Sequence, residues 1–181
     1  MCSVVIFQSE LDTATITALP RLKQSISYLF QKHHLTLAIA EGSTYNAVTD
    51  VLISITGSDQ FLLGALYCHH PLSYVQLMGV SPAIVKNQSK DPKLMVKALL
   101  NGIKKRIRAS LYCVVYNVPG QSQFGLGFQF SDHIIVKLVP FEGDNEQVKQ
   151  KILYTALTYL KTYLVLYDKK EMPVMEEFLS I

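Results

Sequence analysis

The chain has 181 residues, of which 49% are apolar and 17% charged, and its formal net charge is +3. This composition excludes a disordered chain and indicates one domain with a sizeable buried core. The charge is well below that of a dedicated nucleic-acid binder, so no nucleic-acid partner is expected. No apolar run reaches the ~18 residues of a membrane span, so no membrane partner is expected either.

The cysteine pattern and the first residues indicate the compartment. The chain has three cysteines, Cys2, Cys68 and Cys113, and no Cys-x-x-Cys pair. An odd number without such a pair argues against disulfides and favours a reducing environment. The first residues also lack the basic region of a signal peptide. The sequence therefore predicts a cytoplasmic protein.

Residues 1–18 are predicted to be an N-terminal extension, with a short strand at Val4 to Phe7. A single domain is predicted over residues 19–181. It begins with a helix over Leu19 to Lys32, where apolar residues recur at helical spacing. Pro20 lies near the start of this helix, where a missing N–H has little effect.

The next part of the domain is predicted to alternate strands and helices. Leu35 to Ala40 is almost continuously apolar, as expected for a strand that helices cover on both faces. The turn residues Thr56-Gly57-Ser58-Asp59 separate a helix from the strand that follows it. The helix, that strand and a further short helix are predicted over Tyr45 to Ile55, Phe61 to His69 and Leu72 to Met78.

The second half is predicted to contain a helix, a strand, a hairpin and a long helix. Loop signals at Ser81-Pro82 and Ser89 to Pro92 precede the first of these. The elements are predicted over Pro92 to Ile107, Leu111 to Tyr116, Gly125 to Phe130, His133 to Val139 and Asn145 to Tyr167, before a short tail over Pro173 to Ile181. This order predicts an α/β fold, a three-layer α/β/α sandwich with a mixed central sheet.

The most informative stretch is residues 36–46, Thr-Leu-Ala-Ile-Ala-Glu-Gly-Ser-Thr-Tyr-Asn. An apolar strand ends at Glu41, and small, hydroxyl and turn-forming residues follow. Such a junction aims backbone N–H groups and short side chains into a crevice at the carboxyl end of a sheet. The stretch resembles the Ala-Glu-Ser-Cys-Thr-Gly-Gly signature of the CinA C-terminal domain, the nicotinamide-nucleotide amidase family, whose nucleophilic serine falls on Gly42.

The resemblance covers about residues 20–165 and keeps the order and spacing of the family's segments. The family's Ser-Gly-x-Ala-Gly-Pro loop falls on residues 116–121, which places Asn117 and Gly120 among the expected ligand-binding residues. Its Phe-x-Gly-Asp-Arg helix start falls on residues 141–145. The resemblance implies a CinA C-terminal-like sandwich that forms homo-oligomers, needs no cofactor and uses no metal.

The resemblance also implies hydrolysis of the carboxamide of nicotinamide mononucleotide, which yields nicotinate mononucleotide and ammonia. In that family a serine attacks, and a tyrosine and a lysine transfer protons and stabilise charge. In this chain the serine falls on Gly42, the tyrosine on His69 and the lysine on Tyr74. The positions that match would shape the crevice and bind ligand rather than attack: Glu41, Thr44, Gly143 and Asp144.

The candidate catalytic residues are therefore Ser43, His69 and Tyr74. Ser43 lies one residue after the family's nucleophile position, and it could instead be the N-cap of the helix near Tyr45. His69 is a candidate general base, because its unperturbed pKa is close to neutral. Its alternative is a histidine at a strand end whose ring is satisfied by a backbone carbonyl.

Two acidic residues also have two interpretations. Glu41 is either a pocket carboxylate with a shifted pKa or a structural acceptor for nearby backbone N–H groups. Asp144 follows Gly143 and either caps the long helix or lies near a nucleotide phosphate, and the two roles can coexist.

The three consecutive residues Cys68, His69 and His70 are all of types that bind metal ions. Neighbouring strand residues point to opposite faces, so only Cys68 and His70 could share a metal ion. Two ligands make a poor site, and no metal is expected.

Three functions are compatible with these residues. The first, favoured by the concerted loss of the family's three reacting residues, is a domain that lacks amidase chemistry but keeps a remodelled nucleotide or small-ligand pocket. The second is an active amidohydrolase (deamidase) with relocated machinery, in which Ser43 acts with His69 or Tyr74. The third is a non-enzymatic interaction protein whose pocket is closed by the larger side chains of Tyr45, Asn46 and Tyr116.

Overall fold

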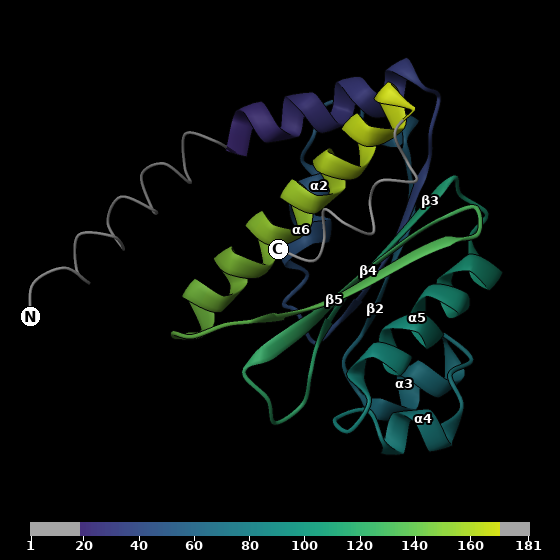
Figure 1. Ribbon diagram of the computed structural model, residues 1–181, viewed down its shortest axis with the longest axis vertical. Helices are drawn as coiled ribbons and strands as arrows, with labels where there is room; N and C mark the ends of the chain where they lie inside the picture. The colour runs from purple at the N-terminus through teal and green to yellow at the C-terminus, as the bar shows by residue number, and fades with distance from the viewer. Residues whose placement is uncertain (1–18, 171–181) are drawn as a thin grey trace, which may run out of the picture.

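The computed structural model describes residues 19–170, and Figure 1 shows their arrangement. The predicted strand at Val4 to Phe7 and the predicted tail at Pro173 to Ile181 lie outside the described residues. The first described element is a helix over residues 19–32, as predicted. Within the described residues, no helix combines the length and the apolarity that crossing a membrane requires.

The centre of the fold is a five-stranded mixed sheet with the strand order β2-β1-β3-β4-β5. Its strands are β1 (Leu37–Gly42), β2 (Leu62–Cys68), β3 (Leu111–Asn117), β4 (Gln123–Phe130) and β5 (His133–Pro140). β1 pairs in parallel with both β2 and β3, whereas β4 and β5 continue the sheet as an antiparallel hairpin. The predicted α/β class and mixed sheet are confirmed.

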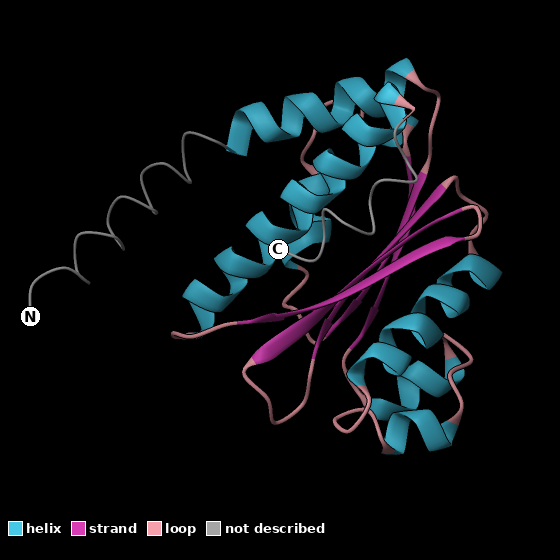
Figure 2. Cartoon of the chain, viewed as in Figure 1, coloured by secondary structure: helices cyan, strands magenta, loops and turns pink. Residues whose placement is uncertain are grey.

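Helices cover both faces of this sheet, as Figures 1 and 2 show. The helices that follow residues 19–32 are α2 (Ala47–Ile53), the short 3-10 turn η1 (Ser58–Gln60), α3 (Pro71–Gln76), α4 (Pro82–Lys86), α5 (Pro92–Arg106) and α6 (Asn145–Lys169). Helix 19–32, α2 and α6 lie on one face, and α3, α4 and α5 lie on the other (Figure 1). Every residue of β1 is buried, because β1 lies between these two helical layers.

Helix 19–32 is fixed to the far end of α6 by one carboxylate. The Asp168 Oδ1 atom accepts from the Lys32 Nζ atom at 2.6 Å and lies 2.5 Å from the His33 Nε2 atom. The Lys32 ammonium and the His33 ring hold the pKa of Asp168 below its usual value. This cluster joins the first and last described helices of the domain.

Most strands and helices differ from their predicted bounds by one or two residues, and two of the differences have clear physical reasons. The helix predicted from Tyr45 begins at Ala47, because Tyr45 and Asn46 have φ angles of 59° and 55°. These left-handed values cannot continue a right-handed helix. Ser81-Pro82 was interpreted as a loop signal, but Pro82 opens the short helix α4, where proline lacks only an N–H that would have no partner.

Candidate functional site

The candidate site lies where β1 ends and turns into α2. Ser43, Tyr45 and Asn46 all have φ angles in the left-handed region, at 55°, 59° and 55°. Each non-glycine residue in that region costs about 1–2 kcal/mol relative to the right-handed form. Such backbone persists only where the surroundings hold it, and it is frequent at functional sites. The turn after Gly42 is therefore held in a strained shape by its neighbours.

Glu41 is the main contact that holds the turn. Its side chain is 2% exposed, and its carboxylate accepts from the Thr44 Oγ1 atom at 2.5 Å and the Thr49 backbone N–H at 2.6 Å. A longer contact of 3.5 Å joins it to the Val48 N–H. The carboxylate therefore satisfies the first N–H groups of α2, which is the structural-acceptor interpretation of Glu41.

The interpretation of Ser43 as the N-cap of α2 is wrong. The N-cap residue is Asn46, and its side chain makes no capping bond. The helix start is already satisfied by Glu41, which reaches it from the preceding strand. The Ser43 hydroxyl is consequently available for other contacts.

The structure brings Ser43 and His69 together. The Ser43 Oγ atom lies 3.3 Å from the His69 Nδ1 atom and 3.4 Å from the His69 carbonyl oxygen, both at the long end of hydrogen-bond range. His69 is exposed, and its ring stacks on that of Tyr67, with centroids 6.4 Å apart. Within residues 19–170 no carboxylate is hydrogen-bonded to the His69 ring, so nothing orients it as the acid of a catalytic triad does.

The family's nucleophile position has no room for a serine side chain. A Cβ atom built on Gly42 would lie 2.7 Å from the Tyr116 Cδ2 atom and 2.8 Å from the Tyr74 hydroxyl oxygen. Real Cβ atoms essentially never approach other heavy atoms so closely. The two tyrosines therefore occupy the volume in which the family's attacking oxygen would stand.

Both tyrosines are fixed in that volume by hydrogen bonds. The Tyr74 hydroxyl donates to the Cys68 carbonyl oxygen at 3.1 Å, and the Tyr116 hydroxyl donates to the Gln88 Oε1 atom at 2.6 Å. Burial raises the pKa of Tyr74 to about 12, with a smaller opposing effect from the Ser43 hydroxyl. The Tyr74 phenol is therefore neutral near pH 7 and can donate a proton but is not a ready base.

The start of α6 lies next to the same turn. The Tyr45 hydroxyl donates to the Asn145 Oδ1 atom at 3.2 Å. Asp144 caps α6 by accepting from the Gln147 N–H at 3.0 Å, and the Gln147 side chain accepts in return from the Asp144 N–H. The capping interpretation of Asp144 is thus confirmed, and Gly143 before it has a φ of 113°.

One predicted ligand-binding residue has an unsatisfied atom. The Asn117 Oδ1 atom, at the carboxyl end of β3, is buried and has no hydrogen-bond partner. Gly120 lies in the turn beyond it with a φ of 71°, and nothing lies within 4 Å of its Cβ position. Among the described residues, no backbone hydrogen bond joins Gly120 to the Ser43 turn.

Sequence reasoning missed two contributors to this site, Tyr67 and Asn145. A signal existed for Tyr67, because it lies two residues before His69 and therefore on the same face of an extended chain. Asn145 falls on the arginine position of the family's helix start, but its contact with Tyr45 could not be predicted, since it joins residues 100 positions apart. Tyr116 was expected to close the pocket together with Tyr45, but Tyr45 is 46% exposed and only Tyr116 is buried.

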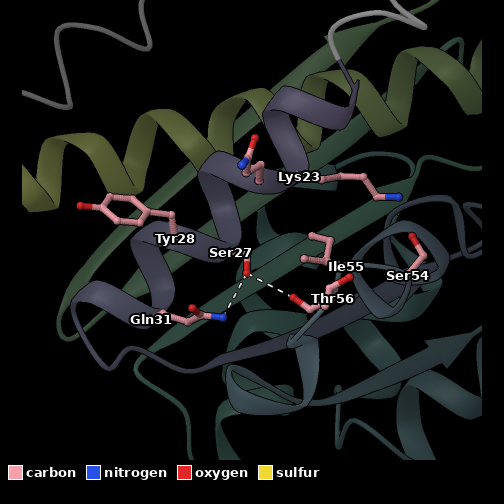
Figure 3. Close-up of a pocket in the computed structure, with 8 residues that line it drawn as sticks. Lys23, Ser27, Tyr28, Gln31, Ser54, Ile55 and Thr56 are labelled. Carbon is pink, nitrogen blue, oxygen red and sulfur yellow. Dashed lines mark hydrogen bonds between the residues drawn. The ribbon is translucent and has the colours of Figure 1, made fainter.

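A separate cavity of about 390 Å³ lies between helix 19–32 and the end of α2, as Figure 3 shows. Its hydrogen bonds are internal: the Ser27 hydroxyl donates to the Thr56 carbonyl and accepts from the Gln31 side chain. Its lining residues are Lys23, Gln24, Ser27, Tyr28, Gln31, Ser54, Ile55 and Thr56. None of them belongs to the turn after β1, so this cavity is not part of the candidate site.

Comparison with solved structures supports the fold. The structure resembles a competence or damage-inducible protein from Enterobacter asburiae, with a TM-score of 0.75 and 15% identity, covering 81% of this chain and 98% of that one. It also resembles a competence/damage inducible protein from Agrobacterium tumefaciens, with a TM-score of 0.72 and 16% identity, covering 78% of this chain and 93% of that one.

Sequence comparison gives the same family. A CinA-like protein from Geotalea daltonii is 23% identical over 149 residues, and one from Syntrophus aciditrophicus is 26% identical over 153 residues. These matches cover 77% and 79% of this chain but only 36% of each relative, so the chain spans about a third of their length. The family described as the CinA C-terminal domain matches residues 20–164. The chain therefore belongs to the CinA C-terminal domain family.

Proposed function

We propose that this chain has lost the amidohydrolase reaction of its family and binds a nucleotide or another small ligand in a remodelled site. The loss is supported by the crowding at Gly42, where a Cβ atom would lie under 3 Å from two tyrosine side chains. A serine at that position could neither fit nor present its oxygen to a substrate. His69 and Tyr74 stand where the family has its tyrosine and lysine, so no part of the original proton transfer remains in place.

A retained ligand site is supported by Asn117. A buried acceptor without a partner costs about 1–3 kcal/mol, and a donor on a ligand would remove that penalty. The Asn117 Oδ1 atom is such an acceptor, and it lies at the carboxyl end of the sheet, where α/β proteins bind ligands. The exposed rings of Tyr67 and His69 lie at the same end of the sheet, at the end of β2, which β1 separates from β3, and they offer a flat surface for a base or another ring.

The test combines a hydrolysis assay with a binding assay on the same protein. With nicotinamide mononucleotide we expect no ammonia above the buffer control, whereas a saturating nucleotide should raise the melting temperature by about 5 °C or more. Asn117→Leu should remove that shift without lowering the melting temperature of the free protein, because it removes an unsatisfied acceptor.

Gln129→Leu is the matched control, because Gln129 also has a buried, unpartnered oxygen but lies near the opposite end of the sheet. That variant should keep the nucleotide shift. Steady release of ammonia would refute the loss of the reaction. The absence of a shift with any nucleotide, or an unchanged shift in Asn117→Leu, would refute the ligand site.

A second candidate function is hydrolysis by Ser43 with His69 as the base. The 3.3 Å contact between the Ser43 hydroxyl and the His69 ring favours it. The strained strand-to-helix turn at Ser43 favours it too, because such turns expose the nucleophile in other hydrolases.

If this candidate is correct, Ser43→Ala will reduce any measured hydrolysis by about 10⁴-fold or more, as removal of a nucleophile does. His69→Ala should cause a loss of similar size, because a serine hydroxyl needs a base. The assay is ammonia release with a panel of linear amides. Tyr67→Phe serves as the control, since it keeps the ring stack and removes only a hydroxyl. Activity that survives Ser43→Ala would exclude the mechanism.

A further inference from the structure

The helices that cover one face of the sheet are strongly basic. The layer formed by α3, α4 and α5 spans residues 71–106 and contains seven cations and one carboxylate, that of Asp91. Its net charge is therefore +6, although the whole chain has only +3. The small charge of the whole chain thus conceals a local concentration of positive charge. All seven cations are exposed: Lys86, Lys90, Lys93, Lys97, Lys104, Lys105 and Arg106.

Three lysines form a stripe along the exposed side of α5. At 3.6 residues per turn, Lys93, Lys97 and Lys104 lie within about 40° of one another around the helix axis. α5 contains no carboxylate that could pair with them three or four residues away. None of the three forms an ion pair with another element within residues 19–170, and Lys104 donates to the Ser131 carbonyl oxygen at 3.5 Å. The stripe therefore presents its charge to solvent.

The first part of this stripe is unfavourable for the helix itself. Lys93 lies in the first turn of α5, where the helix dipole favours carboxylates and disfavours cations. Lys97 follows four residues later, and like charges at this spacing repel. The cations of the last turn, by contrast, are favoured by the dipole. Local rules are thus broken at Lys93 and Lys97 without a compensating ion pair among the described residues, which is typical of residues that serve a function.

The other residues of this surface indicate what kind of anion it fits. Leu94 is 44% exposed and lies beside the stripe, and residues 75–111 include no aromatic residue. Proteins that bind single-stranded nucleic acid stack its bases on aromatic side chains, which this surface lacks. Helices that lie on a membrane bury a wide apolar face, and one leucine does not provide it. One apolar contact among lysines instead matches a protein helix that carries carboxylates around an apolar side chain.

We propose that the exposed side of α5 binds an acidic amphipathic helix of another protein. Lys93, Lys97 and Lys104 pair with its carboxylates, which recur four and seven residues apart as the lysines do. Leu94 packs against an apolar side chain of the partner. α5 has 15 residues and is about 22 Å long, so a partner helix of about four turns covers it. None of these residues belongs to the candidate ligand site, and α5 lies on the other face of the sheet from α2 and α6 (Figure 1).

The first test compares two labelled helical peptides of the same composition by fluorescence anisotropy. One peptide carries its glutamates and a leucine on one face, and the other carries them all round the helix. The first should bind about tenfold more tightly. The double variant Lys93→Glu/Lys97→Glu should lose about tenfold in affinity and should bind a peptide with lysines in place of the glutamates. Lys149→Glu/Lys151→Glu on α6 changes the net charge equally and should bind the first peptide as the unchanged protein does.

The second test separates binding from stability. Lys93→Gln should raise the melting temperature by about 1–3 °C, because it removes a cation from the first turn, and should weaken binding of the first peptide. A lower melting temperature for Lys93→Gln would overturn the proposal. So would equal affinity for the two peptides, or no binding of the first.

Single-stranded DNA and phosphatidylserine vesicles are the other probes of the same surface. Both should bind the unchanged protein more weakly than the first peptide does. If either binds more tightly than that peptide and loses its affinity in Lys93→Glu/Lys97→Glu, the surface serves a nucleic acid or a membrane and the proposal is wrong.

Discussion

Replacing Glu41 with alanine will lower the free energy of unfolding by about 2–4 kcal/mol, the largest effect expected for a single polar residue of this fold. The carboxylate is buried and accepts from the Thr44 hydroxyl and the Thr49 N–H. Its removal leaves those donors buried without partners. It also frees the strained turn that contains Ser43, which should become mobile before the rest of the domain unfolds.

Urea unfolding, with hydrogen exchange at the turn, measures this effect. Glu41→Gln keeps the shape and one acceptor, so it should cost less than alanine. Thr44→Val removes only one donor to the carboxylate and should cost about 1 kcal/mol. A loss below about 0.5 kcal/mol for Glu41→Ala, the range of ordinary surface changes, would show that the carboxylate does not hold the turn.

Restoring the family's serine by Gly42→Ser will destabilise the protein by about 1–3 kcal/mol and will produce no amidase activity. The new Cβ atom would meet the Tyr116 ring and the Tyr74 hydroxyl at under 3 Å. Gly42→Ala should cost nearly as much, because the clash arises from the Cβ atom and not from the hydroxyl.

A double-mutant cycle separates crowding from other effects at this position. Tyr74→Leu removes the hydroxyl that a Cβ atom on Gly42 would meet at 2.8 Å, so Gly42→Ala should be less harmful in that background. Differential scanning calorimetry of the four proteins gives the coupling. Full additivity would show that Tyr74 is not the obstacle. Ammonia release by Gly42→Ser would show that the position still accepts a working nucleophile.

Much of the fold could be predicted from the sequence, because hydrophobic pattern and turn residues are local. The helix that opens the described residues ends at residue 32, as predicted, and α5 and α6 begin where Pro92 and Asn145 were expected to start them. α2 starts two residues later than predicted, because three nearly consecutive left-handed residues precede it. The sequence pattern does not predict these left-handed φ angles. They are held by the carboxylate of Glu41, which lies in the preceding strand β1.

The candidate site was less accessible to sequence reasoning, because its decisive contacts are non-local. The loss of a serine at Gly42 could be seen in the sequence, but not that Tyr74 and Tyr116 take up its space. The proximity of Ser43 to His69 depends on the parallel pairing of β1 with β2, which opposes Gly42 to Cys68. The absence of a hydrogen-bond partner for the buried Asn117 Oδ1 atom likewise could not be predicted from the sequence, because it depends on all the residues that surround that atom.

The cluster around Asp168 has a consequence for how the chain matures during synthesis. Lys32 and His33 bind a carboxylate that lies 136 and 135 residues further along the chain. Contacts of such long separation form late, because the loop between them must first be closed. During synthesis, helix 19–32 can therefore pack early against nearby residues, as the stack of Phe30 on Phe61 shows, but its contact with α6 forms only after almost the whole domain has been made.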